Sequence, residues 1–369
     1  MSGDANFMRL ALALGRRGLG TTWPNPSVGA VVVEPGTGRI LGTAATAQGG
    51  RPHGEPVALA AAGEAARGAT LYVTLEPCSH HGRTPPCTDA ILAAGIARVV
   101  SALEDPDPRV AGRGHDLLRR GGVAVETGLM RDEAARDHVG HVTRVTRGRP
   151  ALHLKLARTR DGFCAAAGPE RLRITGPVAD GAVHLWRAHA DAILIGIGTA
   201  RADDPSLTVR LPGLGARSPL RVVLDTHLRL SPASVLARTA RDTPTLVLTT
   251  RSAPAHARRA LEALGVAVAT VPADPAGGID LPAALTHLGE RGLTRLCSEG
   301  GPRLAEALAR ADLIDACTLV TGPMALGPAG GLRALGPALA EALSGDRFHE
   351  AERLQFGPDA AVTYERNRT

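Results

Sequence analysis

The segment LEPCSHHGRTPPC, residues 75–87, gathers side chains that could do chemistry. It contains two of the five cysteines in the chain, together with two adjacent histidines, three prolines and a glycine. Proline fixes φ and removes an N–H donor, while glycine permits conformations that other residues avoid, so the segment is predicted to be a shaped loop. Loops that present cysteine and histidine in a set geometry usually hold a metal ion, a disulfide or a nucleophile.

A second polar pair lies upstream, where His53 and Glu55 begin an apolar helical pattern. His-x-Glu at a helix start and Pro-Cys-x8-Cys after a strand provide the residue types of an open zinc site. Three ligands, His53, Cys78 and Cys87, would leave a fourth position for water, whose pKa the metal lowers toward neutrality. Glu55 follows His53 by two residues, so its side chain points in another direction and suits proton transfer beside the metal.

Zinc-dependent nucleobase deaminases have a similar arrangement, His-x-Glu followed by Pro-Cys-x-x-Cys. Here eight residues separate the cysteines, and His-x-Glu by itself is common by chance. Two other interpretations therefore stay open: a structural zinc closed by His80 or His81, or buried cysteines without a metal. A structural zinc would give Glu55 no role, which favours the interpretation as a catalytic site.

Four stretches follow one another in the first part of the chain: TTWPNPSVGAVVV, PHGE, TLEPCSHHGRTPPCTDAI and DPDPRVAGRGHDLLRRGGVAVETGL. Together they resemble the deaminase half of the bifunctional riboflavin-biosynthesis proteins. The resemblance implies a cytidine-deaminase-like, three-layer domain that removes the 2-amino group of a diaminopyrimidinone carrying a ribosylamino 5′-phosphate. The residues that it implies are the zinc ligands His53, Cys78 and Cys87, the proton shuttle Glu55, and the substrate contacts Asn25 and Arg83.

Two positions depart from the pattern of that family. The family usually has Ala-Glu-Val where this chain has Gly-Glu-Pro ending in Pro56, and a histidine expected seven residues before the zinc histidine is Thr46. The ligands and the acid are intact, so the chemistry is expected to survive. Substrate affinity is the property that these changes would alter.

The chain of 369 residues exceeds one typical core and predicts two α/β domains. In the first half we expect strands at 27–34, 38–45, 69–76, 96–104 and 123–128, and helices at 54–68, 87–95, 114–120 and 131–146. In the second half we expect strands at 151–159, 190–200, 219–226, 244–250, 266–272 and 293–301. The polar helix and the RGRP segment at 147–150 place the boundary between domains 1–148 and 149–369.

The second half carries two glycine turns that could cradle a phosphate, at 196–198 and at Gly300-Gly301-Pro302. Each is weak alone, because strand-to-helix turns also use glycine for packing, and the full Gly-x-Gly-x-x-Gly dinucleotide fingerprint is absent. Lys155, on a predicted strand, is the single lysine among 42 basic residues. So strong a bias against lysine makes Lys155 a candidate functional residue.

The order LKLARTRDG, RITGPVADGAVHLWRAHADAILIGIGTARADDPSLTVR, VVLDT and CSEGGPRLAEAL resembles the reductase half of the same family, whose fold is like dihydrofolate reductase. The resemblance implies NADPH as hydride donor and reduction of a ribosyl group to an open ribityl chain. The implied substrate contacts are Arg187, Asp203, Leu207, Arg210 and Glu299. The implied cofactor contacts are Ala157, Thr175, Thr199, Thr226, Gly301, Pro302, Arg303 and Leu304. Two further residues are candidates by their own chemistry and position, Lys155 for the substrate and Arg173 for the cofactor.

Physically, Arg187 and Arg210 could hold a substrate phosphate bidentately, and Lys155 could orient ribose oxygens. The segment before Ile174, AAGPERLR, departs from the family pattern by losing a serine and an aromatic residue or lysine, with Arg173 standing in.

Composition and charge pattern give no support for a nucleic-acid-binding, membrane-spanning or secreted protein. The net charge of +6 comes from scattered arginines without runs of aromatics, so we expect an anionic small-molecule substrate and no nucleic acid. No apolar run reaches the roughly 20 residues of a membrane span, and the first 20 residues do not resemble a signal peptide. Five cysteines, an odd number, favour a reducing cytoplasm.

We therefore expect a cytoplasmic, homo-oligomeric bifunctional enzyme that uses zinc and NADPH. The alternatives are a zinc-dependent nucleobase deaminase with a degenerate C-terminal domain, and a metal-stabilised regulatory or scaffold protein without turnover.

Overall fold

The computed structural model describes residues 3–82, 84–108, 110–167 and 172–367. The chain forms two compact units. Unit 1 comprises Met1–Pro150 with Gly289–Thr294, and unit 2 comprises Ala151–Leu288 with Arg295–Thr369. The sequence did not predict that Gly289–Thr294 would be grouped with unit 1.

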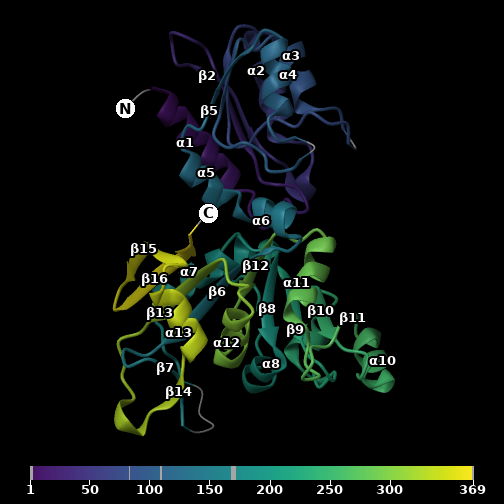
Figure 1. The fold of residues 1–369 in the computed structure, drawn as a ribbon, viewed down its shortest axis with the longest axis vertical. Helices are drawn as coiled ribbons and strands as arrows, with labels where there is room; N and C mark the ends of the chain where they lie inside the picture. Colours follow the sequence, from purple (N-terminus) through teal and green to yellow (C-terminus); the bar gives the residue numbers. More distant parts are fainter. Residues whose placement is uncertain (1–2, 83, 109, 168–171, 368–369) are drawn as a thin grey trace. The chain divides into compact units, whose positions relative to one another are not determined.

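Unit 1 is built on a five-stranded sheet in the order β2-β1-β3-β4-β5. β1 pairs antiparallel with β2 and β3, while β3, β4 and β5 are parallel. In Figure 1, α2, α3 and α4 lie on one side of this sheet and α1 and α5 on the other, which gives three layers. The strands are β1 Gly29–Val33, β2 Ile40–Ala45, β3 Thr70–Val73, β4 Arg98–Ser101 and β5 Ala124–Thr127. The helices are α1 Gly3–Arg16, η1 Gln48–Gly50, α2 Gly54–Ala62, η2 Gly63–Ala66, α3 Cys87–Ala93, α4 Arg113–Arg120, α5 Arg131–Asp137 and α6 Val139–Arg147.

Small residues bring the helices of unit 1 close to the sheet. Strands β1 and β3 are buried along their whole length. A Cβ added at Gly29 would lie 1.8 Å from the carbonyl oxygen of Ala11 in α1, and one added at Gly42 would lie 2.2 Å from that of Ala58 in α2. Both glycines therefore allow direct backbone contact, which fits a core made of alanine and aliphatic side chains.

Two helix predictions in unit 1 were wrong in their extent. The helix predicted at 54–68 ends as α2 at Ala62, because Gly63 adopts a φ of 56° and begins the short η2. The helix predicted at 131–146 is two helices, α5 and α6, that meet at His138. His138 is 2% exposed and its Nε2 lies 3.1 Å from Thr74 Oγ1, so tertiary packing decides the break.

Unit 2 is built on a nine-stranded sheet in the order β11-β10-β9-β8-β12-β6-β13-β16-β15. The pairs from β11 to β13 are parallel, and β13, β16 and β15 pair antiparallel. The strands are β6 Ala151–Arg158, β7 Phe163–Ala166, β8 Ala192–Gly196, β9 Leu220–Leu224, β10 Thr245–Thr249, β11 Ala267–Thr270, β12 Arg295–Ser298, β13 Ala316–Thr321, β14 Gly331–Arg333, β15 Phe348–Phe356 and β16 Asp359–Arg366. The helices are α7 Pro177–Ala188, α8 Ile197–Asp203, η3 Gly215–Arg217, α9 Val235–Arg238, α10 Ala255–Ala263, α11 Leu281–Glu290, α12 Pro302–Arg310, η4 Gly327–Ala329 and α13 Pro337–Ser344.

The six strands predicted in the second half correspond to β6, β8, β9, β10, β11 and β12. The hairpin of β15 and β16 was missed, because β15 is mostly exposed and charged and lacks a period-2 apolar pattern. The parallel strands all end at one edge of the sheet, where the predicted reductase residues follow β8, β9 and β12.

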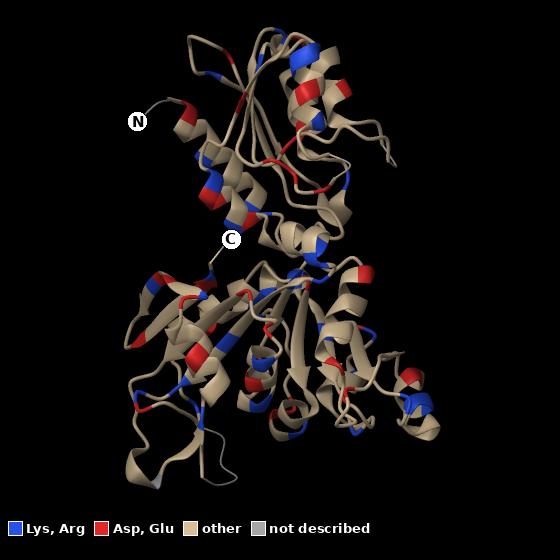
Figure 2. Ribbon diagram, viewed as in Figure 1, with Lys and Arg blue, Asp and Glu red and all other residues tan. Residues whose placement is uncertain are grey.

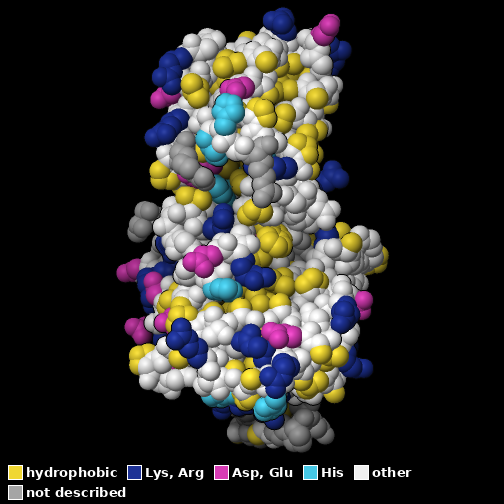
Figure 3. All heavy atoms as spheres, turned by 90° about the vertical axis from the view of Figure 1, so that its right-hand side faces the viewer, with side chains coloured by type: hydrophobic (Ala, Val, Ile, Leu, Met, Phe, Trp, Pro, Cys, Tyr) yellow, Lys and Arg dark blue, Asp and Glu magenta, His cyan; other side chains and the backbone are white. Residues whose placement is uncertain are grey.

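Charged residues of both signs are interspersed along the helices and loops of both units (Figure 2). On the face drawn in Figure 3, cationic side chains are scattered among apolar, acidic and uncharged ones. None of the helices in the described residues is long and apolar enough to cross a bilayer.

Candidate active sites

His53, Cys78 and Cys87 come together in unit 1. His53 is the N-cap of α2, Cys78 lies in the loop after β3, and Cys87 begins α3. His53 Nδ1 lies 3.3 Å from Cys87 Sγ and 3.7 Å from Cys78 Sγ. Within the described part of the chain these three residues form one of two groups whose ligand atoms all lie within 4.8 Å of one another.

The spacing of these atoms fits zinc. Tetrahedral zinc with Zn–S of about 2.3 Å and Zn–N of about 2.0–2.1 Å requires sulfur and nitrogen ligand atoms roughly 3.5 Å apart. The two observed His53–cysteine distances lie on either side of that value. One imidazole and two thiols match a catalytic zinc, which keeps one coordination position open.

A hydrogen bond between the two thiols shifts their pKa values in opposite directions. The pKa of Cys78 is lowered to about 4, first by its hydrogen bond with Cys87 and, against the effect of burial, also by His53. The same hydrogen bond, followed by burial, raises the pKa of Cys87. The backbone N–H of Cys87 also donates to Cys78 Sγ at 3.3 Å. The pair is thus organised to carry negative charge, as a metal-binding thiolate must.

Glu55 lies in the first turn of α2 beside this cluster. It is 3% exposed, and its Oε2 has no hydrogen-bond partner in the described residues. Burial first, and then the charge of Cys78, raises the pKa of the Glu55 carboxyl. A buried carboxyl with a raised pKa and a free oxygen can both accept and release a proton, as general acid–base catalysis requires.

The other residues predicted in unit 1 lie as follows. Asn25 Nδ2 donates to the carbonyl of Gly50 at 2.7 Å and lies 3.4 Å from His53 Nε2, so Asn25 reaches the cluster. Arg83 lies outside the described residues. His80 and His81 do not belong to the His53 group of ligand atoms, which disfavours the structural zinc that either of them would close.

We expect the variant Cys87→Ser to lose most of its zinc, because serine replaces one of three protein ligands and is a poor zinc donor. Metal analysis of the purified protein, with Cys297→Ser as a matched control, measures this. Cys297 is a buried cysteine of unit 2 outside the cluster. Stoichiometric, tightly held zinc in Cys87→Ser would contradict the ligand assignment.

Glu76, two residues before Cys78, anchors the metal-site loop. Its Oε1 accepts the backbone N–H groups of Gly114 and His115 at 2.8 and 3.3 Å, and its Oε2 accepts those of Asp105 and Gly112 at 3.2 and 3.0 Å. Glu76 also belongs to the second group of potential metal ligands, with Glu104 and His115. Four N–H donors use the lone pairs of the carboxylate, so this group is a backbone anchor and not a second metal site.

We expect Glu76→Gln to destabilise unit 1, since the amide NH2 cannot accept the two N–H groups that one carboxylate oxygen accepted. Each buried donor left unpaired costs about 1–3 kcal/mol. Thermal unfolding of zinc-loaded protein measures the effect, and Glu104→Gln, an exposed neighbour, is the control. Unfolding of Glu76→Gln at the wild-type temperature would refute the anchoring role.

In unit 2, Arg187 of α7 and Glu299, just after β12, form a bidentate ion pair. Arg187 Nε and Nη2 lie 2.5 and 2.8 Å from the two oxygens of Glu299, and Nη1 donates to the carbonyl of Thr208 at 3.0 Å. Their side chains are only 12% and 11% exposed. Burial opposes ionisation of Glu299, but Arg187 and then Lys155 outweigh it and lower its pKa. A substrate phosphate would have to share Arg187 with Glu299, so the predicted phosphate contact of Arg187 stays a prediction.

Lys155 lies on β6 and is half-buried. In the described residues it has no hydrogen-bond or ion-pair partner, although its charge acts on Glu299. An ammonium group in this position is available to a ligand.

The two glycine turns of unit 2 meet. The backbone N–H of Gly301, the N-cap of α12, donates to Thr199 Oγ1 in α8 at 3.1 Å. Pro302, Arg303 and Leu304 form the first turn of α12. The helix start thus presents its N–H groups beside Thr199, an arrangement that favours a phosphate.

The remaining predicted residues of unit 2 are spread around this edge. Arg173 and Thr175 both donate to Asp180 of α7, at 3.1 and 3.0 Å. Arg210 donates from Nη1 to Ser206 Oγ at 3.0 Å, and its backbone N–H donates to His184 Nδ1 at 3.3 Å. The others are Ala157, half-buried on β6, Asp203, exposed at the end of α8, and Leu207, buried with a φ of 53°.

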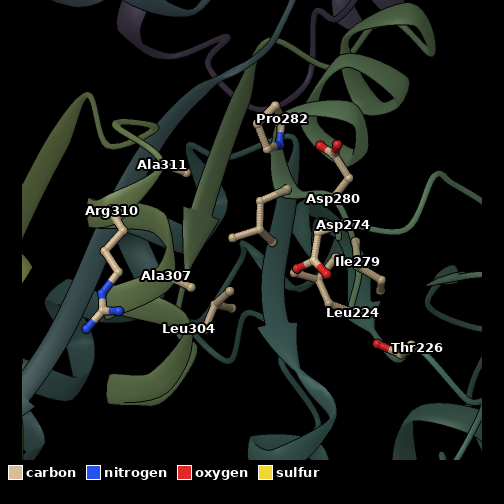
Figure 4. A pocket seen from close by; sticks show the side chains of 11 residues that line it. Leu224, Thr226, Asp274, Ile279, Asp280, Pro282, Leu304, Ala307, Arg310 and Ala311 are labelled. Atoms are coloured by element: carbon tan, nitrogen blue, oxygen red, sulfur yellow. The ribbon is translucent and has the colours of Figure 1, made fainter. Parts of the chain in front are cut away.

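A pocket of about 520 Å³ brings Thr226 and Leu304 together. Leu304 and Ala307 of α12 lie on one side of it, and Leu224 and Ile279 on the other (Figure 4). Most of the lining side chains are apolar, and Thr226, Asp274 and Asp280 add polar groups, so the pocket is suited to a flat ring system with polar edges. Arg310, the cation among the residues lining the pocket, pairs with Glu306 at 3.1 Å.

Sequence reasoning missed Glu76, Asp180 and His184. Glu76 stands inside the quoted loop motif, whose spacing to Cys78 could have drawn attention to it. Asp180 and His184 lie on α7 among mostly apolar residues, and only their contacts with Arg173, Thr175 and Arg210 distinguish them.

Comparisons with known proteins cover both units. Residues 1–103 match the family model of the cytidine and deoxycytidylate deaminase zinc-binding region, and residues 150–362 match that of the RibD C-terminal domain. Riboflavin biosynthesis protein RibD of Escherichia coli (strain K12) is 40% identical over 380 residues, covering 97% of this chain and 98% of that protein. RibD of Aquifex aeolicus (strain VF5) is 38% identical and covers 98% of each.

Solved structures agree with these matches. Acinetobacter baumannii RibD, form 1, has a TM-score of 0.86 at 33% identity and covers 99% of each chain. The Thermotoga maritima diaminohydroxyphosphoribosylaminopyrimidine deaminase/5-amino-6-(5-phosphoribosylamino)uracil reductase has a TM-score of 0.84 at 32% identity, again over 99% of each.

These matches confirm the predicted fold class, a cytidine-deaminase-like domain followed by a reductase domain, and disfavour the alternative of a degenerate C-terminal domain. The chain belongs to the RibD family of bifunctional riboflavin-biosynthesis enzymes, which join a zinc-dependent deaminase to an NADPH-dependent reductase.

Proposed function

We propose that this chain deaminates 2,5-diamino-6-ribosylamino-4(3H)-pyrimidinone 5′-phosphate and then reduces the ribosyl group of the product to ribityl. The observation that carries the proposal is the His53–Cys78–Cys87 cluster with Glu55 buried beside it. The name of the Thermotoga maritima relative describes the same pair of activities. We assign deamination to residues 1–148 and reduction to residues 149–369.

In the deamination step, His53, Cys78 and Cys87 would hold zinc, which when bound acidifies water at the open position. Glu55 takes a proton from the attacking water and delivers protons to the ring nitrogen and the departing amine. Water adds its oxygen to the ring carbon, the bond to the 2-amino group breaks, and ammonia leaves. Asn25, whose amide lies 3.4 Å from His53 Nε2, would orient the pyrimidine.

In the reduction step, bound NADPH would supply the hydride for C1′ of the ribosyl group, and uptake of a proton would complete the open ribityl chain and leave NADP+. Lys155 and the Arg187–Glu299 pair are suited to the substrate's polar groups. The start of α12 with Thr199 suits the cofactor's pyrophosphate, and the pocket beside Thr226 and Leu304 suits its adenine ring.

Purified protein incubated with the diaminopyrimidinone, with and without NADPH, tests the proposal. We expect ammonia release under both conditions and NADPH oxidation only after deamination. Ammonia release without NADPH oxidation would instead support a deaminase with an inactive second domain. The cytoplasmic location and the homo-oligomeric state stay predictions; the five free cysteines of the described structure are consistent with a reducing compartment.

A further inference from the structure

Arg51 links the two segments that supply the zinc ligands. It lies two residues before His53, in the connection between η1 and α2. Its Nη1 donates to Thr84 Oγ1 at 2.5 Å, and Thr84 belongs to the loop between Cys78 and Cys87. The guanidinium is therefore held at the rim of the metal site by a neutral hydroxyl, and its other four N–H groups remain for other partners.

The charge of Arg51 is not neutralised by the protein. In the described residues Arg51 has no carboxylate partner, although it is half-buried. Two other arginines of unit 1 show the contrast, since Arg39 pairs with Glu34 at 3.0 Å and Arg98 pairs with Asp4 at 2.9 Å. A partly desolvated, unpaired guanidinium favours binding of an anion.

Neighbouring polar groups do not supply that charge. Asn25, whose side chain contacts His53, is neutral and already donates to Gly50. Thr46 is buried, and its hydroxyl is bonded to the backbone N–H and carbonyl of Val28. Arg51 is thus the described cation next to the zinc ligands that can meet a phosphate.

We propose that Arg51 binds the 5′-phosphate of the deaminase substrate and makes unit 1 select the phosphorylated compound over its dephosphorylated form. The inference rests on the proposed function and adds a specificity residue to it. Thr84 would hold the guanidinium in orientation, and two of its remaining N–H groups would meet two phosphate oxygens, the geometry for which arginine is better suited than lysine.

The test compares Arg51→Ala, Arg51→Lys and Arg39→Ala, the last as an exposed, ion-paired control in the same unit. Ammonia release is measured with the phosphorylated diaminopyrimidinone and with its dephosphorylated form. We expect Arg51→Ala to raise KM for the phosphorylated substrate about 10- to 100-fold, the range for losing a charge-assisted contact, with kcat and the dephosphorylated substrate little affected. The KM of Arg51→Lys for the phosphorylated substrate should lie between those of the wild type and Arg51→Ala, and the KM of Arg39→Ala should match the wild type.

Inhibition by inorganic phosphate gives a second readout, because free phosphate would occupy the same site when the substrate carries no phosphate. The inhibition constant of phosphate, measured with the dephosphorylated substrate, should rise in Arg51→Ala by about the same factor as KM for the phosphorylated substrate. Equal losses with both substrates, unchanged kinetics, or loss of zinc from Arg51→Ala would each overturn the inference. Absence of ammonia release by the zinc-loaded wild type from either compound would instead overturn the proposed function.

Discussion

Glu55→Gln is expected to lower the rate of ammonia release by ~10²–10⁴-fold, the usual contribution of a positioned acid–base group. Glutamine keeps the size of the side chain but cannot take a proton from water. Glu55 is 3% exposed and its Oε2 has no protein partner in the described structure, so this oxygen is free to exchange a proton with water or substrate. The fold-change is obtained from the rate of ammonia release at saturating substrate, and the zinc content is measured in parallel.

Reduction should be untouched by the same change, because each set of active-site residues lies within its own unit. NADPH oxidation with pre-deaminated substrate is the internal control, and Glu64→Gln, an exposed glutamate of η2, is the matched variant. If folded, zinc-loaded Glu55→Gln lost both activities, the assignment of two independent sites would fail. If Glu55→Gln released ammonia at the wild-type rate, Glu55 would not be the proton shuttle.

Lys155→Met is expected to impair reduction and leave deamination intact, with kcat/KM for reduction lowered about 10- to 100-fold. Methionine retains much of the length of the side chain but removes the ammonium group. Lys155 has no protein partner in the described structure, and its charge acts on Glu299, so the loss should fall on substrate binding and orientation. NADPH oxidation with the deaminated substrate measures it.

Three comparisons make this result specific. Ammonia release by Lys155→Met should equal that of the wild type. Lys155→Arg keeps the charge and should recover part of the reduction, whereas Arg259→Met, an exposed cation of α10, should change neither activity. Undiminished NADPH oxidation by Lys155→Met would show that Lys155 does not contact the substrate.

Local patterns determined much of the fold. Short apolar runs predicted β6, β8, β9, β10, β11 and β12, since the strands of a covered parallel sheet are continuously apolar. The β15–β16 hairpin was not predicted, because β15 is mostly exposed and has no such apolar run. The division of 131–146 into α5 and α6 depends on burial of His138 against Thr74, which are 64 residues apart. Local helix propensity cannot predict a contact between residues so far apart in the sequence.

The sequence by itself determined the deaminase chemistry, because the types and spacing of His53, Glu55, Cys78 and Cys87 fall in two short segments. Only the tertiary structure decided which partners the charged residues have. Arg187 and Glu299 are 112 residues apart and meet because α7 and the end of β12 lie at one edge of the sheet. The sequence alone does not distinguish Arg187, which is ion-paired, from Arg51, which is not, because ion pairing depends on distance in space and on burial.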